Sequence, residues 1–258
     1  MNRQDSAQPF IRLLEIMDQL RENCPWDKEQ TFESIRNLSI EEVYEMADAI
    51  IQKKYSDLKK ELGDLLLHIV FYSRIAEEQQ LFSITDVIES INTKLVFRHP
   101  HVFGNTDVKG SPEIVKQNWE ELKKKEGNKT VLGGVPSSLP ALIKANRVQE
   151  KVRAVGFDWD DRRQVWDKVA EELSELKNEI ETMDKEKIEM EFGDLFFSLV
   201  NAARLYHIDP ETALERTNRK FIKRFNYLEE QTIKKGLSLK NMTLKEMDEI
   251  WEEAKKFD

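Results

Sequence analysis

The chain has 258 residues, of which 34% are charged and 40% apolar, and it contains only 9 glycines and 7 prolines. This composition favours a mostly helical, soluble protein, and the length suits one large domain or two small ones. The formal net charge is −9 and no basic run dominates any segment, which argues against broad nucleic-acid binding. A phosphate ligand would therefore need a local cationic pocket or a metal ion.

Cys24 is the single cysteine, so the chain has no internal disulfide framework and fits a reducing compartment. The first ten residues lack the apolar core of a signal peptide, and no run approaches the length of a membrane span. We expect a cytoplasmic protein that does not engage membranes.

Helical periodicity accounts for the chain from end to end, and no segment shows the alternation of a strand. In chain order we predict an N-terminal module at 1–125, a linker rich in Gly, Pro and Ser at 126–138, and a C-terminal module at 139–258. Each module is expected to hold four or five helices. Those of the second module are predicted at 140–154, 163–182, 184–206, 210–233 and 243–256. The predicted fold class is all-α, with tandem duplicated helical-bundle modules.

An internal repeat supports the duplication. The segment IEEVYEMADAI (40–50) matches AEELSELKNEI (170–180), and KELGDLLLHIV (60–70) matches MEFGDLFFSLV (190–200), both at an offset of 130 residues. Further along, INTKLVFR (91–98) parallels TNRKFIKR (217–224), and WEELKKKE (119–126) parallels WEEAKKFD (251–258). Blocks that recur in the same order indicate one duplicated helical unit.

The acidic residues of each repeat fall beside the apolar stripe of a helix. Glu172 and Glu175 lie along one edge of the stripe on the first helix, and Glu191 and Asp194 share a face of the next. A tight turn would bring the two pairs together, and four close carboxylates need cations or protons. One EExxE motif would indicate an ordinary solvated face, but two copies, each followed by ExxD at equal spacing, favour metal binding. The expected ion is Mg²⁺, with Mn²⁺ as a substitute.

Lys220 and Arg224 are one helical turn apart and are repeated at Lys94 and Arg98. An ammonium and a planar guanidinium suit phosphate oxygens, so this pair is a candidate phosphate clamp, although a solvated basic edge is the alternative. Trp251 is open to two interpretations, stacking on a base or packing between helices.

The motifs EExxE and ExxD, present twice and preceded by CPWDKEQTFESI, resemble those of the MazG family of nucleoside triphosphate pyrophosphohydrolases. The resemblance extends to RHPHVF (98–103), LPALIKANRVQEK (139–151) and VGFDW (155–159), and so to nearly the whole chain. It implies an all-α, usually dimeric, Mg²⁺-dependent enzyme. Such an enzyme hydrolyses nucleoside triphosphates to the monophosphate and pyrophosphate.

The resemblance also implies roles for individual residues. Metal ligation would fall to Glu172, Glu175, Glu191 and Asp194. As a separate mechanistic hypothesis, Glu172 or Glu175 accepts the proton of the attacking water, and Lys220 and Arg224 stabilise the charge that develops on the leaving group. The substrate contacts would be Lys168, Glu171, Lys187, Asn201, Lys220, Arg224 and Trp251. For Lys187 and for the base contact of Trp251, the resemblance is the whole of the argument.

The first module holds equivalent acids, Glu42, Glu45, Glu61 and Asp64, and so a second possible metal site. It departs elsewhere, because Leu38, Asp57 and Phe71 stand at the positions of Lys168, Lys187 and Asn201. We hypothesise that the second module holds the main catalytic site. The first would then be weaker, differently selective or mainly a dimerisation module.

Two other functions fit parts of the pattern. A di-iron bundle would need Glu-x-x-His motifs, whereas Asp64 and Asp194 occupy the histidine position. A non-catalytic, metal-binding regulatory or scaffold module would show no nucleotide turnover, and the Lys220, Arg224 and Trp251 set argues against it. The expected partners are nucleoside triphosphates, with broad base specificity, and a second copy of the chain in a homodimer. Pairing of the chain's own two halves is the alternative to the homodimer.

Overall fold

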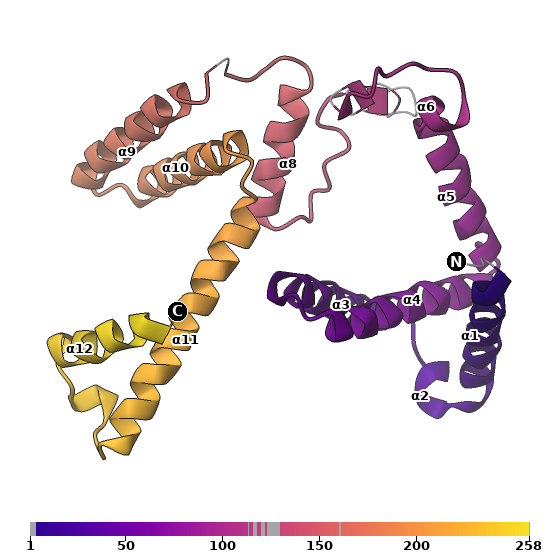
Figure 1. Ribbon diagram of the computed structural model, residues 1–258, viewed down its shortest axis with the longest axis horizontal. Helices are drawn as coiled ribbons and strands as arrows, with labels where there is room; N and C mark the ends of the chain where they lie inside the picture. Colours follow the sequence, from indigo (N-terminus) through magenta and orange to yellow (C-terminus); the bar gives the residue numbers. More distant parts are fainter. Residues whose placement is uncertain are drawn as a thin grey trace. The chain divides into compact units, whose positions relative to one another are not determined.

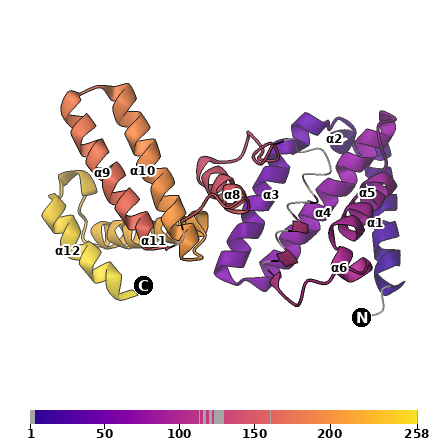
Figure 2. The same cartoon turned by 90° about the horizontal axis from the view of Figure 1, so that it is seen from above.

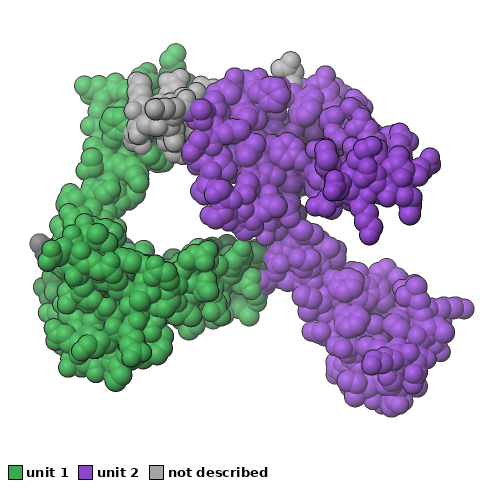
Figure 3. All heavy atoms as spheres, turned by 180° about the vertical axis from the view of Figure 1, so that it is seen from behind, with its two compact units in different colours: residues 1–119 green, residues 120–258 purple. Residues whose placement is uncertain are grey.

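The computed structural model describes residues 4–112, 114–115, 118–119, 122, 130–159 and 161–257. All regular structure in these ranges is helical, with no strand, which confirms the predicted all-α class. The chain divides into two compact units, residues 1–119 and 120–258 (Figure 3). Residues 126–129 of the predicted linker lie outside the described residues, so the module boundary stays a prediction.

The first unit is built on a helical hairpin. Its helices are α1 (Gln4–Asn23), α2 (Pro25–Lys28), α3 (Phe32–Gln52), α4 (Tyr55–Glu78), α5 (Ile84–Arg98) and α6 (Pro100–Phe103). The long helices α3 and α4 lie antiparallel against each other, and α1 packs on α4 (Figures 1 and 2). Met17, Ile35, Val70, Phe71 and Ile75 form its buried core. This core packs one face of the α3–α4 hairpin against α1.

The second unit repeats the hairpin. Its helices are α8 (Ala141–Arg153), α9 (Gln164–Thr182), α10 (Lys185–Leu205), α11 (Pro210–Lys234) and α12 (Leu244–Ala254), with short 3-10 turns η1 (Leu239–Asn241) and η2 (Lys255–Phe257). Every predicted helix of this unit is confirmed, with ends within two residues of those expected. Helices α9 and α10 lie antiparallel, α8 packs on α10 and α11, and α12 folds back on α11 (Figure 1).

Both hairpins turn in the same way. Lys53 ends α3 with φ 56°, and Met183, its counterpart 130 residues later, ends α9 with φ 60°. Each residue adopts the left-handed conformation that commonly stops a helix, although neither is glycine. In the second unit Asp184 then caps α10 by accepting hydrogen bonds from the backbone N–H groups of Glu186 and Lys187. The tight turn assumed from the sequence is therefore present in both units.

A buried arginine fixes α10 against the segment that follows α8. The guanidinium of Arg204 donates hydrogen bonds to the Asp158 carboxylate, at 3.0 Å from Nη1 to Oδ2, and to Asn201 Oδ1, at 2.8 Å from Nε. The Arg204 side chain is only 7% exposed. Asn201, a predicted substrate contact, is thus buried with its side-chain oxygen already engaged.

None of the described helices has the length and apolar character needed to cross a bilayer.

Replacing Arg204 with methionine should lower the free energy of unfolding by about 3 kcal/mol, because Asp158 loses its buried partner in a largely buried position and keeps only the longer contact with Arg153 Nε, at 3.4 Å. Urea unfolding followed by circular dichroism would measure the change. Arg163→Met is the matched control, since Arg163 pairs with Asp161 at an exposed position in the same unit. Equal stability of the two variants would contradict a structural role for the Arg204 cluster.

Candidate metal and phosphate site

The α9–α10 hairpin brings three of the four predicted metal ligands together. Carboxylate oxygens of Glu172, Glu175 and Glu191 lie within 4.8 Å of one another. Glu172 is buried, Glu191 is half-buried and Glu175 is exposed. Asp194, the fourth predicted ligand, lies one turn after Glu191 on α10 and acts electrostatically on it. The convergence follows from i,i+3 spacing on two antiparallel helices joined by a tight turn.

The cluster raises the pKa of Glu191 above its ordinary value of 4.5. The largest cause is burial, and the next are the negative charges of Glu175 and Asp194. In addition, Glu191 Oε2 is buried and has no hydrogen-bond partner among the residues that the structure describes. Buried polar atoms without partners are uncommon and mark a place where an ion or water belongs. Oxygen ligands around such an atom fit a hard divalent cation.

Two predicted phosphate lysines flank the cluster. Lys168 Nζ lies 2.8 Å from Glu172 Oε1 and 3.0 Å from Glu171 Oε1, and these hydrogen bonds raise the pKa of Lys168. Lys187, near the start of α10, lies 3.6 Å from Glu179 Oε1. Each ammonium is therefore held by a carboxylate of α9, Lys168 by Glu172 and Lys187 by Glu179. Glu171 serves here as a partner of Lys168.

The remaining predicted residues form a separate group on α11 and α12. The guanidinium carbon of Arg224 lies 5.7 Å from the ring centroid of Trp251. The ring centroids of Phe221 and Trp251 are 4.9 Å apart. Trp251 thus has a packing role between two helices, and its base contact stays a prediction. Lys220 is exposed on α11. Figure 1 shows α12 lying apart from the α9–α10 hairpin within this unit, so the chain does not bring the two groups together by itself.

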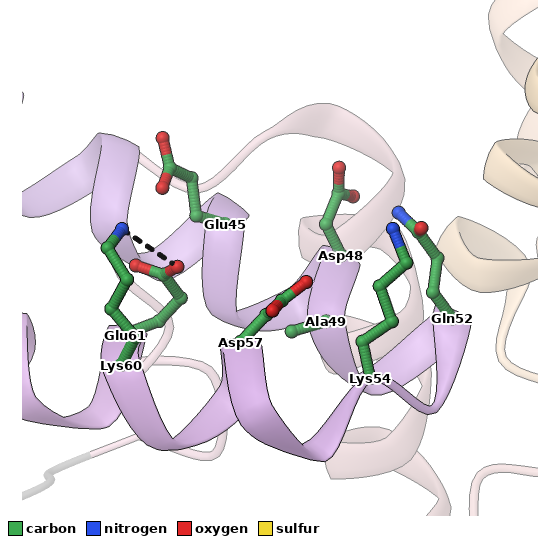
Figure 4. Close-up of a pocket in the computed structure, with 8 residues that line it drawn as sticks. All are labelled: Glu45, Asp48, Ala49, Gln52, Lys54, Asp57, Lys60 and Glu61. Carbon is green, nitrogen blue, oxygen red and sulfur yellow. Dashed lines mark hydrogen bonds and ion pairs between the residues drawn. The ribbon is translucent and has the colours of Figure 1, made fainter.

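The first unit contains the second predicted cluster. Oxygens of Glu42, Glu45 and Glu61 also lie within 4.8 Å of one another. Lys60 Nζ lies 3.3 Å from Glu61 Oε1 and 3.8 Å from Asp64 Oδ2. The cluster borders a pocket between α3 and α4 (Figure 4). That pocket is lined by Glu45, Asp48, Ala49, Gln52, Lys54, Asp57, Lys60 and Glu61.

The two clusters distribute charge in opposite ways. In the second unit the lysine pairs with Glu172 on the first helix of the hairpin, and the pKa of Glu191 on the second helix is raised. In the first unit the lysine pairs with Glu61 on the second helix. There the pKa of Glu42, on the first helix, is raised by burial and by the charges of Asp64 and Glu45.

The sequence comparison missed Lys54 and Lys60 as site residues. The comparison started from the lysines of the second module, and the corresponding residues of the first module are Leu38 and Asp57. The reverse comparison at the same offset would have found them, since Lys60 stands opposite Met190 and Lys54 opposite Asp184.

Comparisons with known proteins agree with this geometry. The MazG nucleotide pyrophosphohydrolase domain matches twice, at residues 30–103 and 162–228, each match spanning one hairpin. The chain is similar to the nucleoside triphosphate pyrophosphohydrolase/pyrophosphatase MazG of Thermotoga maritima, with 45% identity over 95% of both chains. It is also similar to the nucleoside triphosphate pyrophosphohydrolase of Escherichia coli K12, with 41% identity over 95% of this chain and 96% of that one. An uncharacterized Bacillus subtilis protein, YabN, is 43% identical over 95% of this chain and 51% of its own length.

The raised pKa of Glu191 predicts a pH-dependent stability in metal-free protein. Its contribution is fully present below the ordinary pKa of 4.5 and is lost as the pH rises through the raised value, because the ionised form is disfavoured in the fold. The melting temperature of Glu191→Gln should therefore equal that of the wild type at about pH 4 and exceed it at about pH 7.

Calorimetric melting in the presence of a chelator would test this, with Glu189→Gln, an exposed carboxylate on the same helix, as control. Mg²⁺ should raise the wild-type melting temperature at neutral pH and have a smaller effect on Glu191→Gln. Identical pH profiles for the wild type and Glu191→Gln would show that the pKa of Glu191 is not raised in the fold.

Proposed function

Since this chain belongs to the MazG family and is a nucleoside triphosphate pyrophosphohydrolase, we propose that its C-terminal acidic cluster is the main catalytic site. The observation that carries the proposal is the contact of Lys168 with Glu172 beside the three converging carboxylates, because Leu38 stands at the position of Lys168 in the first unit. We propose hydrolysis of ribo- and deoxyribonucleoside triphosphates between the α and β phosphates, with broad base specificity.

Glu172, Glu175, Glu191 and Asp194 would hold Mg²⁺, with Mn²⁺ as a substitute. The residues fit this role because oxygen ligands meet from two rigid helices and one of these oxygens lacks any other partner. When bound, the ion would polarise phosphoryl oxygens and lower the pKa of a coordinated water.

The surroundings of the acids suggest which one accepts the proton. Glu172 Oε1 lies 2.8 Å from Lys168 Nζ, so this carboxylate already has a cationic partner. Glu175 is exposed and has no ion pair among the described residues, so we assign it as the acceptor. The water oxygen would bond to the α phosphorus as the bond from that phosphorus to the bridging oxygen breaks, and the water proton would pass to Glu175.

The basic residues would bind the phosphates. Lys168 and Lys187 lie beside the cluster, where the charge of a triphosphate would replace their present carboxylate partners. Lys220 and Arg224 would stabilise the pyrophosphate leaving group, and Trp251 would contact the base. These three lie on α11 and α12, so their action requires an approach to the cluster when substrate binds or when two copies pair.

We also propose that the chain forms a homodimer. The apolar stripe predicted on the hairpin is only partly covered within one chain. Val165 and Leu176 are buried, but Leu173, Ile180 and Phe192 are about two-fifths exposed, and Phe196 is 60% exposed. A contiguous apolar face on two packed helices indicates a protein interface, and a second copy offers a matching surface. The cytoplasmic location expected from the sequence stays a prediction.

The proposed reaction is tested by incubating a panel of nucleoside triphosphates with Mg²⁺ and identifying the products. We expect monophosphate and pyrophosphate, whereas diphosphate and orthophosphate would refute cleavage between the α and β phosphates. Glu172→Gln should lower kcat by roughly 100-fold, since it removes a metal ligand and the partner of Lys168. Glu42→Gln should lower it no more than about threefold, the scale of a change outside the main site.

Glu181→Gln is the control for these variants, because Glu181 is exposed on α9 outside the cluster. Equal loss of turnover in Glu172→Gln and Glu42→Gln would overturn the assignment of the main site to the second unit.

The homodimer is tested by light scattering coupled to size exclusion. The wild type should elute with twice its chain mass of 30.4 kDa, and Phe196→Asp should shift the mass towards that of one chain, because it places a charge on the apolar face. Leu244→Asp, at an exposed position on α12, is the control and should stay dimeric. A monomeric wild type would refute the dimer.

A further inference from the structure

Helix α12 ends without a stop signal of its own. Lys255, the residue after it, keeps a helical conformation with φ −59°, and the chain tightens directly into the 3-10 turn η2. The last carbonyl groups of a helix have no partners inside it, and a left-handed residue such as Lys53 or Met183 commonly satisfies them. No residue of η2 adopts that conformation. The end of α12 therefore depends on contacts with another part of the chain.

Two residues of α11 supply those contacts. The ammonium of Lys223 donates a hydrogen bond to the backbone carbonyl of Phe257 in η2. The rings of Tyr227 and Phe257 also meet, with 5.3 Å between their centroids and 39° between their planes. Lys223 and Tyr227 are one turn apart on the same face of α11, so they hold η2 together. These three residues are termed the η2 clamp below.

Trp251 lies in the helical turn that the η2 clamp holds. It stands three residues before Ala254, where α12 ends. Ile250 and Ala254 are buried, whereas Trp251 is half-buried. The last turn of a helix frays unless tertiary contacts hold it, and the side chains of that turn move with it. The position of the indole therefore depends on the η2 clamp.

Helix α11 makes two kinds of contact with the segment that carries Trp251. Arg224 and Phe221 contact the indole itself, and Lys223 and Tyr227 hold the turn that follows. Figure 1 shows α12 folded back on α11, with the C-terminus beside α11. A ring that stacks on a ligand binds best when its orientation is fixed beforehand, because ordering it during binding costs free energy. The η2 clamp provides that order.

The η2 clamp is separate from the acidic cluster. The second match of the MazG domain ends at residue 228, so Trp251 and Phe257 lie beyond it. The carboxylates and the lysines that contact them lie on the α9–α10 hairpin. A change in η2 should therefore alter the position of the indole and leave the metal ligands in place.

We propose that Phe257 is a positioning residue for Trp251, and that the η2 clamp thereby sets how tightly the nucleobase of the substrate is bound. This inference rests on the base contact of Trp251 in the proposed function. Phe257 acts through the end of α12 and Tyr227, and does not itself touch the substrate. Loss of the clamp should weaken binding of the base and leave the chemical step at the α phosphorus unchanged.

The first test is steady-state kinetics of the full-length protein with ATP and Mg²⁺. Trp251→Ala should raise KM roughly tenfold, the scale of losing an aromatic ring that stacks on a base. Phe257→Ala should raise KM roughly three- to fivefold with kcat within about twofold, because it loosens the indole without removing it. Tyr227→Leu removes the same ring contact from the α11 side and should have the same effect. Phe257→Tyr keeps a ring and should retain the wild-type KM.

Lys256→Ala is the matched control. Lys256 is exposed in the same turn and makes no hydrogen bond, ion pair or ring contact with α11 among the described residues, so its variant should match the wild type in KM and kcat. A double-mutant cycle then identifies the residue through which Phe257 acts. In the Trp251→Ala background, Phe257→Ala should cause no further rise in KM, because the side chain that it positions is gone.

A second test needs no substrate. The chain has five tryptophans, so protein labelled with fluorotryptophan should give five fluorine resonances, and the one that is lost in Trp251→Phe belongs to Trp251. Phe257→Ala should shift or broaden that resonance and leave the others unchanged. Lys256→Ala should leave all of them unchanged.

Three results would overturn the inference. They are an unmoved Trp251 resonance in Phe257→Ala, equal KM values for Phe257→Ala and Lys256→Ala, and the same rise in KM from Phe257→Ala with and without Trp251. A wild-type KM in Trp251→Ala would overturn the base contact and the inference together. A raised KM in Trp251→Ala with a wild-type KM in Phe257→Ala would overturn the inference alone, so the two failures are distinguishable.

Discussion

The meeting of several carboxylates between two antiparallel helices is the constraint on which the rest of the structure depends. Charges of one sign this close repel, and burial adds a desolvation cost, so the pKa of one glutamate in each hairpin is raised. Stable packing then requires cations or protons. The chain supplies one lysine contact per cluster from its own helices, and the unpartnered oxygens of Glu61 and Glu191 show that these contacts leave room for a further positive ion.

Duplication preserved the acids and the basic pair Lys94 and Arg98, but not the positions of the lysines that contact the acids. Each acid is constrained in two ways. Its side chain must reach the cluster, and its helix must at the same time pack through its apolar stripe. A lysine has a long, flexible side chain and can reach the same carboxylate group from either helix. A lysine on the second helix of the hairpin, as at Lys60, can therefore replace one on the first helix, as at Lys168, with little change of structure. A glutamate moved in the same way would no longer reach the cluster.

The proposed dimer would connect the partly exposed hairpin to assembly. Val165 and Leu176 pack within the unit, while Phe196 on the neighbouring helix remains largely exposed. The same helices carry the acidic cluster, so covering this face with a second copy would exclude water beside the metal ligands. Binding of substrate and pairing of chains would then act on the same pair of helices.

The sequence alone determined the all-α class, the duplication, the ends of the helices in the second unit and the convergence of the acids. These are local properties: periodicity defines the helices, and i,i+3 spacing with a tight turn places Glu172 and Glu191 together. Only the tertiary structure decided which acid is buried, which is paired with a lysine, and that Asn201 is engaged by Arg204. It also separated Trp251 and Arg224 from the cluster within one unit. The physical reason is that reach, burial and pairing depend on neighbouring helices, and the order of residues along one helix does not specify them.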